Sequence, residues 1–318
     1  MTDYIIRRLL MGVIVLVLVT MFVFIVMRLL PSDPLTLFLS QSETQRLDLE
    51  QLAQLKHEYG LDRPFPIQYW DWMSGVVRGD FGTSIILKER VNTLIAQHLP
   101  VTVHLGILAF LISGVLGVLF GVLCALKRGS WLDNLLTVLA NLGITAPSFW
   151  VGILLILIIA YKLGWLPIYG YTSPFEDLWM STKQVIMPVF CLSLAPMAIL
   201  TRQTRSSMLE VVRQDYIRTA WSKGLRERVV IMRHALKNAF IPIITMQGMQ
   251  IRNIVGGAVI IETVFSIPGV GRMMVDAVKQ QDYQVVQGGV LFIAIAVMIV
   301  NIAVDISYGY FDPRIKLS

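Results

Sequence analysis

The sequence predicts an all-α integral membrane protein with six transmembrane helices and a structured outer insertion between the first two. Of its 318 residues, 55% are hydrophobic and 15% carry a formal charge, whereas about 25% of a soluble domain is charged. The mean hydropathy is +0.67. Several apolar runs exceed the roughly 18 residues that a helix needs to cross a bilayer. These observations exclude a soluble enzyme, a secreted disulfide scaffold and a disordered chain.

Six apolar runs are long enough to be membrane spans. The first, at residues 9–30, follows Arg7 and Arg8 and ends near Pro31 rather than at a small-residue cleavage site. We therefore interpret it as a retained helix and not as a signal peptide. The fourth run is short and contains Pro188 and Pro196. The later runs lie at residues 99–126, 134–163, 185–201, 238–265 and 286–308.

The positions of lysine and arginine orient the chain in the membrane. With the N-terminus inside, the segments on that side hold 15 basic and six acidic residues, and nine of the basic ones lie between residues 202 and 237. Loops rich in Lys and Arg stay on the cytoplasmic side. We therefore place both termini in the cytoplasm. The net charge of +6 then reflects topology rather than nucleic-acid binding.

Two connections are longer than turns, and they divide the chain. Residues 1–30 form an N-terminal segment with the first helix, residues 31–98 an extracytoplasmic insertion, and residues 99–318 a five-helix core. The insertion contains helix-like stretches at residues 48–59 and 69–77, broken by Pro, Gly and Asp, which predicts a small structured subdomain. The other long connection is the basic cytoplasmic segment.

That basic segment, at about residues 202–237, has the pattern of two short amphipathic helices. Apolar residues recur at helical spacing before and after Gly224. Glycine tolerates the positive φ that ends one helix and turns the chain into the next. One interpretation is a solvated loop that binds anionic lipid, and the other is an element that docks into a cytosolic partner. Composition does not choose between them.

The sequence DYIRTAWSKGL, followed by RHALKNAFIP, resembles the cytoplasmic signature loop of ABC-importer permeases of the dipeptide, oligopeptide and nickel branch. The general signature is Glu-Ala-Ala, three residues, Gly and a later Leu-Pro. Here Arg218–Ala220 stands at the Glu-Ala-Ala position, Gly224 matches the Gly, and Ile241-Pro242 lies farther on. The chain lacks the Glu, so a salt bridge made by that residue has no counterpart here.

Further matches to this branch run in family order from about residue 28 to residue 315. Each motif alone is short, but their order along the chain argues against coincidence. The matching motifs are Pro31–Pro34, Tyr59–Asp62, Gly79–Gly82, Pro147–Trp150, Glu262–Phe265, Pro268–Gly269, Asp282–Tyr283, Val286–Gly289 and Asp312–Ile315.

The resemblance implies the ABC type I importer permease fold and a division of labour among subunits. In this family the permease pairs with a second, homologous permease. Two cytosolic ABC ATPase subunits use ATP and Mg to drive the pair, and an extracytoplasmic binding protein delivers the substrate. The chain itself has no GxxxxGK[ST] sequence, which forms the phosphate-binding loop of an ATPase. We therefore expect a permease subunit of a bacterial inner membrane that is not an enzyme.

By the same resemblance, the turn around Gly224 is the coupling element that sits in a groove of an ATPase subunit. Small Ala220 and Gly224 would permit close approach, and the basic residues would pair with acidic groups of the partner. The residues expected to make this contact are Arg218, Thr219, Ala220, Lys223, Gly224, Leu225 and Arg226.

Three ionisable residues in or near the spans are candidates for the translocation path or its gating. Arg252 lies midway along the fifth predicted span, where a lipid-facing charge costs at least ~2.5 kcal/mol. It forms either a structural pair, for instance with Asp305, or part of the substrate path. Glu262 is expected to arrange gating or binding-protein contact rather than to touch substrate. Asp305 is expected to be structural, with Asn301 or a neighbouring permease as its partner.

No metal site or bound cofactor is expected in this chain. Cys124 and Cys191 lie in separate apolar stretches, and the four histidines lack metal-ligand spacing. The resemblance favours short peptides as substrate, with nickel or a metal chelate as the alternative within the family. A stand-alone channel or secondary transporter is a remote alternative, because no inverted repeat is evident. A membrane scaffold that recruits a cytosolic protein is another.

Overall fold

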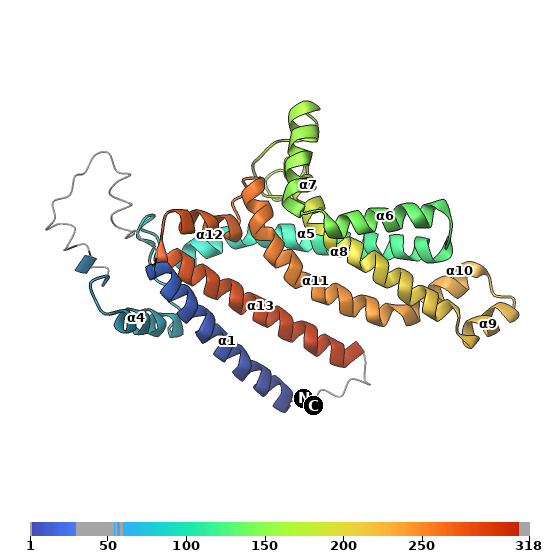
Figure 1. The fold of residues 1–318 in the computed structure, drawn as a ribbon, viewed down its shortest axis with the longest axis horizontal. Coiled ribbons are helices and arrows are strands. Elements are labelled where there is room, and N and C mark those ends of the chain that lie inside the picture. Colours follow the sequence, from blue (N-terminus) through green and yellow to red (C-terminus); the bar gives the residue numbers. More distant parts are fainter. Residues whose placement is uncertain (1, 30–53, 55, 58–59, 312–318) are drawn as a thin grey trace. The chain divides into compact units, whose positions relative to one another are not determined.

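The computed structural model describes residues 2–29, 54, 56–57 and 60–311, with side chains undescribed at residues 2–5 and 305–311. The regular structure of the described residues is helical (Figure 1), apart from an isolated antiparallel β-bridge between Thr83 and Arg90. The predicted helix-like stretch at 48–59 lies almost wholly outside these residues. The motifs Pro31–Pro34 and Asp312–Ile315 also lie outside the described residues, as does Tyr59 of the motif Tyr59–Asp62.

Among the described residues, five helical stretches are long and apolar enough to cross a membrane, or six if one bent pair counts as a single span. This agrees with the six spans predicted. The five are Ile6–Leu29 within α1 (Thr2–Leu29), α5 (Val91–Leu126), α8 (Leu178–Val212), Glu227–Val264 and Tyr283–Val304 within α13 (Tyr283–Phe311). Glu227–Val264 comprises α10 (Glu227–Val229), the π-helix η2 (Val230–Ala235) and α11 (Leu236–Val264).

The third predicted span, at residues 134–163, is not a straight helix. It consists of α6 (Trp131–Thr145) and, after a bend of 105°, α7 (Ser148–Leu155) with the π-helix η1 (Ile156–Lys162). The bend falls at Ala146-Pro147, because the residue before a proline is pushed out of the helical region. Ala146 accordingly has ψ 124°. The predicted span is therefore a bent pair of helices, and the bend itself was not predicted.

The fourth predicted span was too short, since α8 is one helix of 35 residues that includes both internal prolines. Asp177 starts it, because its Oδ1 accepts a hydrogen bond of 2.9 Å from the backbone N–H of Met180. At the other end α8 continues to Val212 and takes in the first part of the basic segment. Likewise α5 begins at Val91 rather than at the predicted residue 99.

The described chain forms two compact units, and the first comprises residues 1–100 and 268–299. It contains α1, α4 (Phe65–Val77), α12 (Val270–Lys279) and the adjoining ends of α5 and α13. The helix at 65–77 covers the predicted stretch at 69–77, whereas α12 was not predicted. The buried apolar cluster of the first unit consists of Met27, Val91, Leu94, Ile95, Val270, Met273, Ala277, Tyr283, Val285 and Val286.

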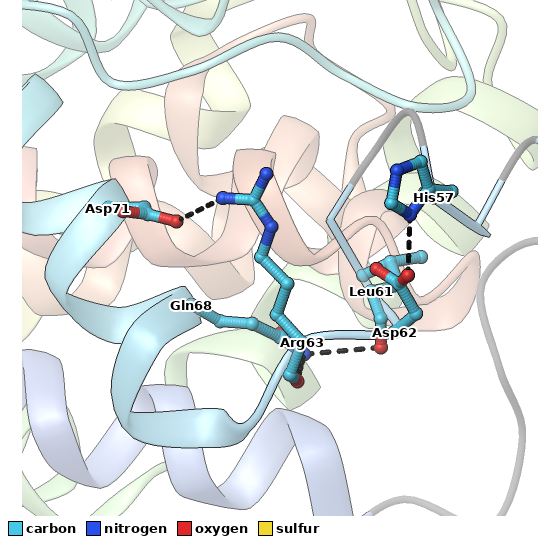
Figure 2. A network of polar contacts seen from close by, with 6 residues as sticks. All are labelled: His57, Leu61, Asp62, Arg63, Gln68 and Asp71. Carbon is cyan, nitrogen blue, oxygen red and sulfur yellow. Dashed lines mark hydrogen bonds and ion pairs between the residues drawn. The ribbon is translucent and has the colours of Figure 1, made fainter.

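Side-chain contacts fix the entry into α4 within this unit (Figure 2). Gln68 donates through Nε2 to the carbonyl oxygens of Leu61, at 3.2 Å, and Arg63, at 2.7 Å. Arg63 in turn donates to Asp71 at 2.9 Å, and His57 Nδ1 lies 2.6 Å from Asp62 Oδ2. The hydrogen bond with His57 lowers the pKa of the Asp62 carboxyl. This end of the insertion is therefore folded, as predicted.

The second unit comprises residues 101–267 and 300–318, and within it α8 packs on α6, α7 and α11. Small residues allow α5 to approach α8 closely. A Cβ atom at Gly121 would lie 2.4 Å from Thr204 Cβ, and one at Gly117 would lie 2.9 Å from Leu200 Cβ. Glycines of this kind permit close helix contacts within membranes. These units do not test the predicted division of the chain at residues 30 and 98, which stays a prediction.

Candidate functional site

The basic segment is built on a buried apolar base in the second unit. After α8 ends, the chain breaks at Arg213-Gln214, and a short helix, α9 (Asp215–Ser222), follows before the turn into α10 (Figure 1). Two helices and a turn were predicted, but the first was expected to run through this break. Gln214 is extended, with ψ 149°, and Asp215 in the first turn suits the positive end of a helix. The base consists of Leu200, Met208, Ile217, Ala220, Val230, Ile231, Ala235, Ala239 and Ile243.

One face of α9 attaches it to this base. Ile217 is fully buried and Ala220 is 7% exposed, and their spacing of three residues places them on the same side of the helix. The prediction that the small side chain of Ala220 permits approach by a partner stays a prediction beside this burial. Its smallness lets α9 lie close to the chain's own core. Ala220 thus positions the exposed residues of the segment.

Gly224 forms the turn after α9. Its φ is +74°, a region that side chains rarely adopt, and a Cβ atom there would meet nothing within 4 Å. The backbone N–H of Lys223 donates to the Thr219 carbonyl at 3.1 Å, and that of Gly224 donates to the Trp221 carbonyl at 2.9 Å. The positive φ predicted at this glycine is confirmed. Because no neighbour crowds the site, the need for glycine comes from the backbone alone.

The other predicted coupling residues lie on the surface of the segment. Arg218, Thr219, Lys223, Leu225 and Arg226 are all exposed. Two aromatic residues beside them, Trp221 and Tyr216, are also exposed and were not among the predicted residues. Tyr216 lies just after the break before α9, and Asn238 Nδ2 donates to its hydroxyl at 2.9 Å.

An ion pair with a buried carboxylate holds the C-terminal part of α8 to α6, and sequence reasoning missed it. Arg205 donates through Nε and Nη2 to the two carboxylate oxygens of Asp133, each at 2.8 Å. The Asp133 side chain is 3% exposed. Its carboxylate also accepts from the Gly129 N–H at 3.0 Å, while Ser130 caps α6. The Ser-x-x-Asp spacing of a capping box was the available signal for the helix start. Nothing in the spacing pointed to Arg205.

Arg252 lies on an exposed face of α11. Exposed residues recur along this helix at Met249, Arg252, Asn253, Gly256 and Ile260, which is helical spacing. A charge midway along a membrane helix is costly against lipid and favourable against water or another polar surface. This face is therefore suited to line an aqueous path or to meet another protein.

Glu262 is placed differently, at the buried end of α11. It is fully buried and accepts a hydrogen bond of 2.6 Å from Thr102 Oγ1 of α5. Its carbonyl accepts from the Ile267 N–H at 2.8 Å, where the chain reverses through Ser266 at φ +54°. Glu262 therefore joins the end of α11 to α5. Asp305 lies within α13, but its side chain is outside the description, and its role stays a prediction.

A second buried polar contact holds the turn at residues 84–89 of the first unit. The Asp282 side chain accepts a hydrogen bond from Ser84 Oγ, and its Oδ1 accepts one of 3.4 Å from the Val285 N–H at the start of α13. Ser84 Oγ also accepts from the Leu87 N–H at 2.8 Å. Asp282 thus caps a helix and anchors the turn at residues 84–89.

We expect Asp282→Ala to lower the free energy of unfolding by about 2 kcal/mol, because it removes a helix cap and leaves a buried hydroxyl without its acceptor. Denaturant unfolding of the purified chain in detergent measures this loss. Asp276→Ala is the matched control. Asp276 lies 3.6 Å from Arg272 and 3.7 Å from Lys279 in partly exposed pairs, which contribute about 0–1 kcal/mol. Equal losses in both variants would contradict the anchoring role.

In the described part of the chain, no group of three or more His, Cys, Asp or Glu side chains comes together in a way that could hold a metal ion. Both cysteines are buried and unpaired with each other.

Two protein families match the chain, and together they span most of it. Residues 117–317 match the family described as "Binding-protein-dependent transport system inner membrane component". Residues 1–106 match the family described as "Binding-prot-dependent transport system membrane comp, N-term".

Curated relatives are similar over their whole length. The dipeptide transport system permease protein DppB of Alkalihalophilus pseudofirmus is 38% identical over 336 residues, covering 99% of this chain and 100% of the relative. The oligopeptide transport system permease protein AppB of Bacillus subtilis is 39% identical over 319 residues, with 99% and 100% covered. The di/tripeptide transport system permease protein DppB of Pseudomonas aeruginosa is 37% identical over 336 residues, with 99% of each covered.

Proposed function

The chain belongs to the family of binding-protein-dependent transport system inner membrane components, and we propose that it forms half of the translocation pathway of an ATP-driven importer for short peptides. The observation that carries the choice of peptides is the full-length similarity to permeases named for dipeptide, di/tripeptide and oligopeptide transport. The chain acts as a conducting subunit and catalyses no reaction of its own.

Four partner subunits complete the importer in this proposal. A second, homologous permease supplies the other half of the pathway, two cytosolic ABC ATPases bind ATP and Mg, and a binding protein delivers peptide from outside. Both termini and the basic segment face the cytoplasm. The excess of basic residues in that segment supports this orientation.

The coupling element is the exposed surface of α9 and its following turn, formed by Arg218, Thr219, Lys223, Gly224, Leu225 and Arg226. Its geometry supports this role, because Ile217 and Ala220 fix the base of α9 while the basic and apolar side chains around the turn stay exposed. A surface held rigidly on α8 and α11 transmits movement of an ATPase to both helices. Alternating access then follows as a shift between two arrangements of the spans.

Arg252 and its face of α11 line the pathway or its border with the second permease. The exposed position of this cation supports the assignment, since peptide carboxylates would be attracted to it. Glu262 contributes to gating by joining the end of α11 to α5 rather than by touching the peptide. Its complete burial and the hydrogen bond from Thr102 support that division.

Reconstitution of the purified complex in liposomes tests the function. Labelled di- and tripeptides should accumulate only when ATP is supplied on the side of the ATPase subunits and the binding protein on the opposite side of the membrane. Accumulation of nickel or a nickel chelate without peptide uptake would contradict the proposed substrate class. Uptake by this chain alone, without ATPase subunits, would contradict the importer and support a stand-alone channel.

A further inference from the structure

A cavity of about 640 Å³, lined by both polar and apolar side chains, lies beside the cytoplasmic end of α8 in the second unit. Its volume is within the range of roughly 300–1,000 Å³ typical of small-molecule sites. One wall is the end of α8, with Arg202, Arg205, Ser206 and Arg213, and the other includes Thr137 and Ala140 of α6. The cavity is separate from the exposed surface of α9, and no role proposed above uses it.

The three arginines of the cavity share one face of α8. Arg205 and Arg213 follow Arg202 by three and eleven residues, which corresponds to about one and three helical turns. Among the ion pairs of the described residues, Arg205 is bound to Asp133, whereas Arg202 and Arg213 are in none. Glu210 lies on the same wall. Even after Asp133 and Glu210 are counted, the site keeps a net positive charge.

The face of α6 that points away from the cavity is apolar. Trp131, Leu135, Leu139 and Leu142 are exposed on this helix, which is one part of the bent membrane span. Tryptophan is enriched where a span meets the membrane surface, and leucine faces acyl chains. Thr137 and Ala140 lie on the opposite face of α6 from these residues, so the apolar lining of the cavity itself is Cys124, Ala140 and Leu209. A ligand that fits both this lining and the arginines has a phosphate group and an apolar part, as the lipid beside a membrane-spanning helix does.

We propose that this cavity binds the phosphate group of an anionic glycerophospholipid of the cytoplasmic leaflet. Guanidinium groups suit phosphate because they present several N–H donors in a fixed plane. Basic pockets between membrane helices on the cytoplasmic side are suited to such headgroups. Arg202 and Arg213 supply the charge, Ser206 a hydroxyl donor, and the Asp133–Arg205 pair holds the two walls together.

Lipid binding and docking to a protein partner, the two interpretations of the basic segment, then belong to different residues. The part carried by α8, up to Arg213, binds lipid beside α6. The part that begins at α9 presents the turn around Gly224 to a protein. The lipid site does not depend on which substrate the importer carries.

Native mass spectrometry of the full-length chain, titrated with phosphatidylglycerol or phosphatidylcholine, tests the site. We expect the wild-type chain to bind phosphatidylglycerol more tightly than phosphatidylcholine. Removing two arginine charges with Arg202→Gln/Arg213→Gln should weaken phosphatidylglycerol binding about 30-fold and leave phosphatidylcholine binding unchanged. Both arginines are exposed, so the thermal unfolding midpoint without lipid should not change.

The matched control is Arg228→Gln/Arg233→Gln, which removes two exposed arginines of the same segment outside the cavity. It should bind phosphatidylglycerol as the wild-type chain does. An equal loss in the control would overturn the site, since it would indicate a general charge effect. Equal binding by the wild-type chain and the cavity variant would also overturn it. Complete displacement of the lipid by millimolar inorganic phosphate would assign the cavity to a free phosphate instead.

Discussion

We expect Asp133→Ala to lower the free energy of unfolding by about 2–3 kcal/mol, because it removes hydrogen bonds to a buried carboxylate, while the Arg205 side chain, 32% exposed, stays in contact with water. The substitution leaves the Arg205 guanidinium between α6 and α8 without its carboxylate, where two hydrogen bonds of 2.8 Å now hold it. It also removes the acceptor of the Gly129 N–H. Denaturant unfolding of the full chain in detergent, followed by circular dichroism, measures the change.

Two further variants separate the buried charge from other effects of Asp133. Asp71→Ala breaks a pair of the same kind, but Asp71 and Arg63 are each about half exposed, and such a pair contributes about 0–1 kcal/mol. Asp133→Leu/Arg205→Met removes both charges and should recover more than half of the lost stability. A double variant as unstable as Asp133→Ala would contradict the ion-pair explanation and point to helix capping by Asp133.

The spans could be predicted from the sequence because each depends on a local property, the length of an apolar run. The effect of each proline could not. Pro147 coincides with a bend of 105°, whereas Pro188 and Pro196 lie inside the unbroken α8. A proline removes one backbone donor in every case. Whether the helix continues depends on its packing, and α8 lies against α6, α7 and α11.

The same distinction applies to the candidate site. The positive φ of Gly224 could be predicted because the need for glycine is set by the backbone at that position. The burial of Ala220 could not, since it depends on which face of α9 meets α8 and η2. Asp133 and Arg205 are 72 residues apart, and no local pattern joins them. Their pairing is a product of helix packing.

The largest functional effect should come from Gly224→Val. A β-branched side chain at φ +74° disfavours the turn by roughly 1–2 kcal/mol. This is enough to lower about tenfold the population of chains in which the turn after α9 has this conformation. No atom lies within 4 Å of the new Cβ, so the effect acts through the backbone. We expect the assembled importer to keep its ATPase activity while peptide uptake per ATP falls about tenfold, as measured in proteoliposomes.

Asparagine and a second glycine provide the controls for this interpretation. Asparagine adopts the left-handed region more readily than other residues, so Gly224→Asn should retain most of the coupled uptake. Gly164→Val introduces the same strain at φ +64°, also with no atom within 4 Å, in the loop after η1. It should lower stability without changing uptake per ATP. Uncoupling by Gly164→Val, or normal coupling in Gly224→Val, would contradict the role of this turn. If Gly224→Asn uncouples as fully as Gly224→Val, the partner contacts the glycine surface itself, and the conformation of the turn is not what matters.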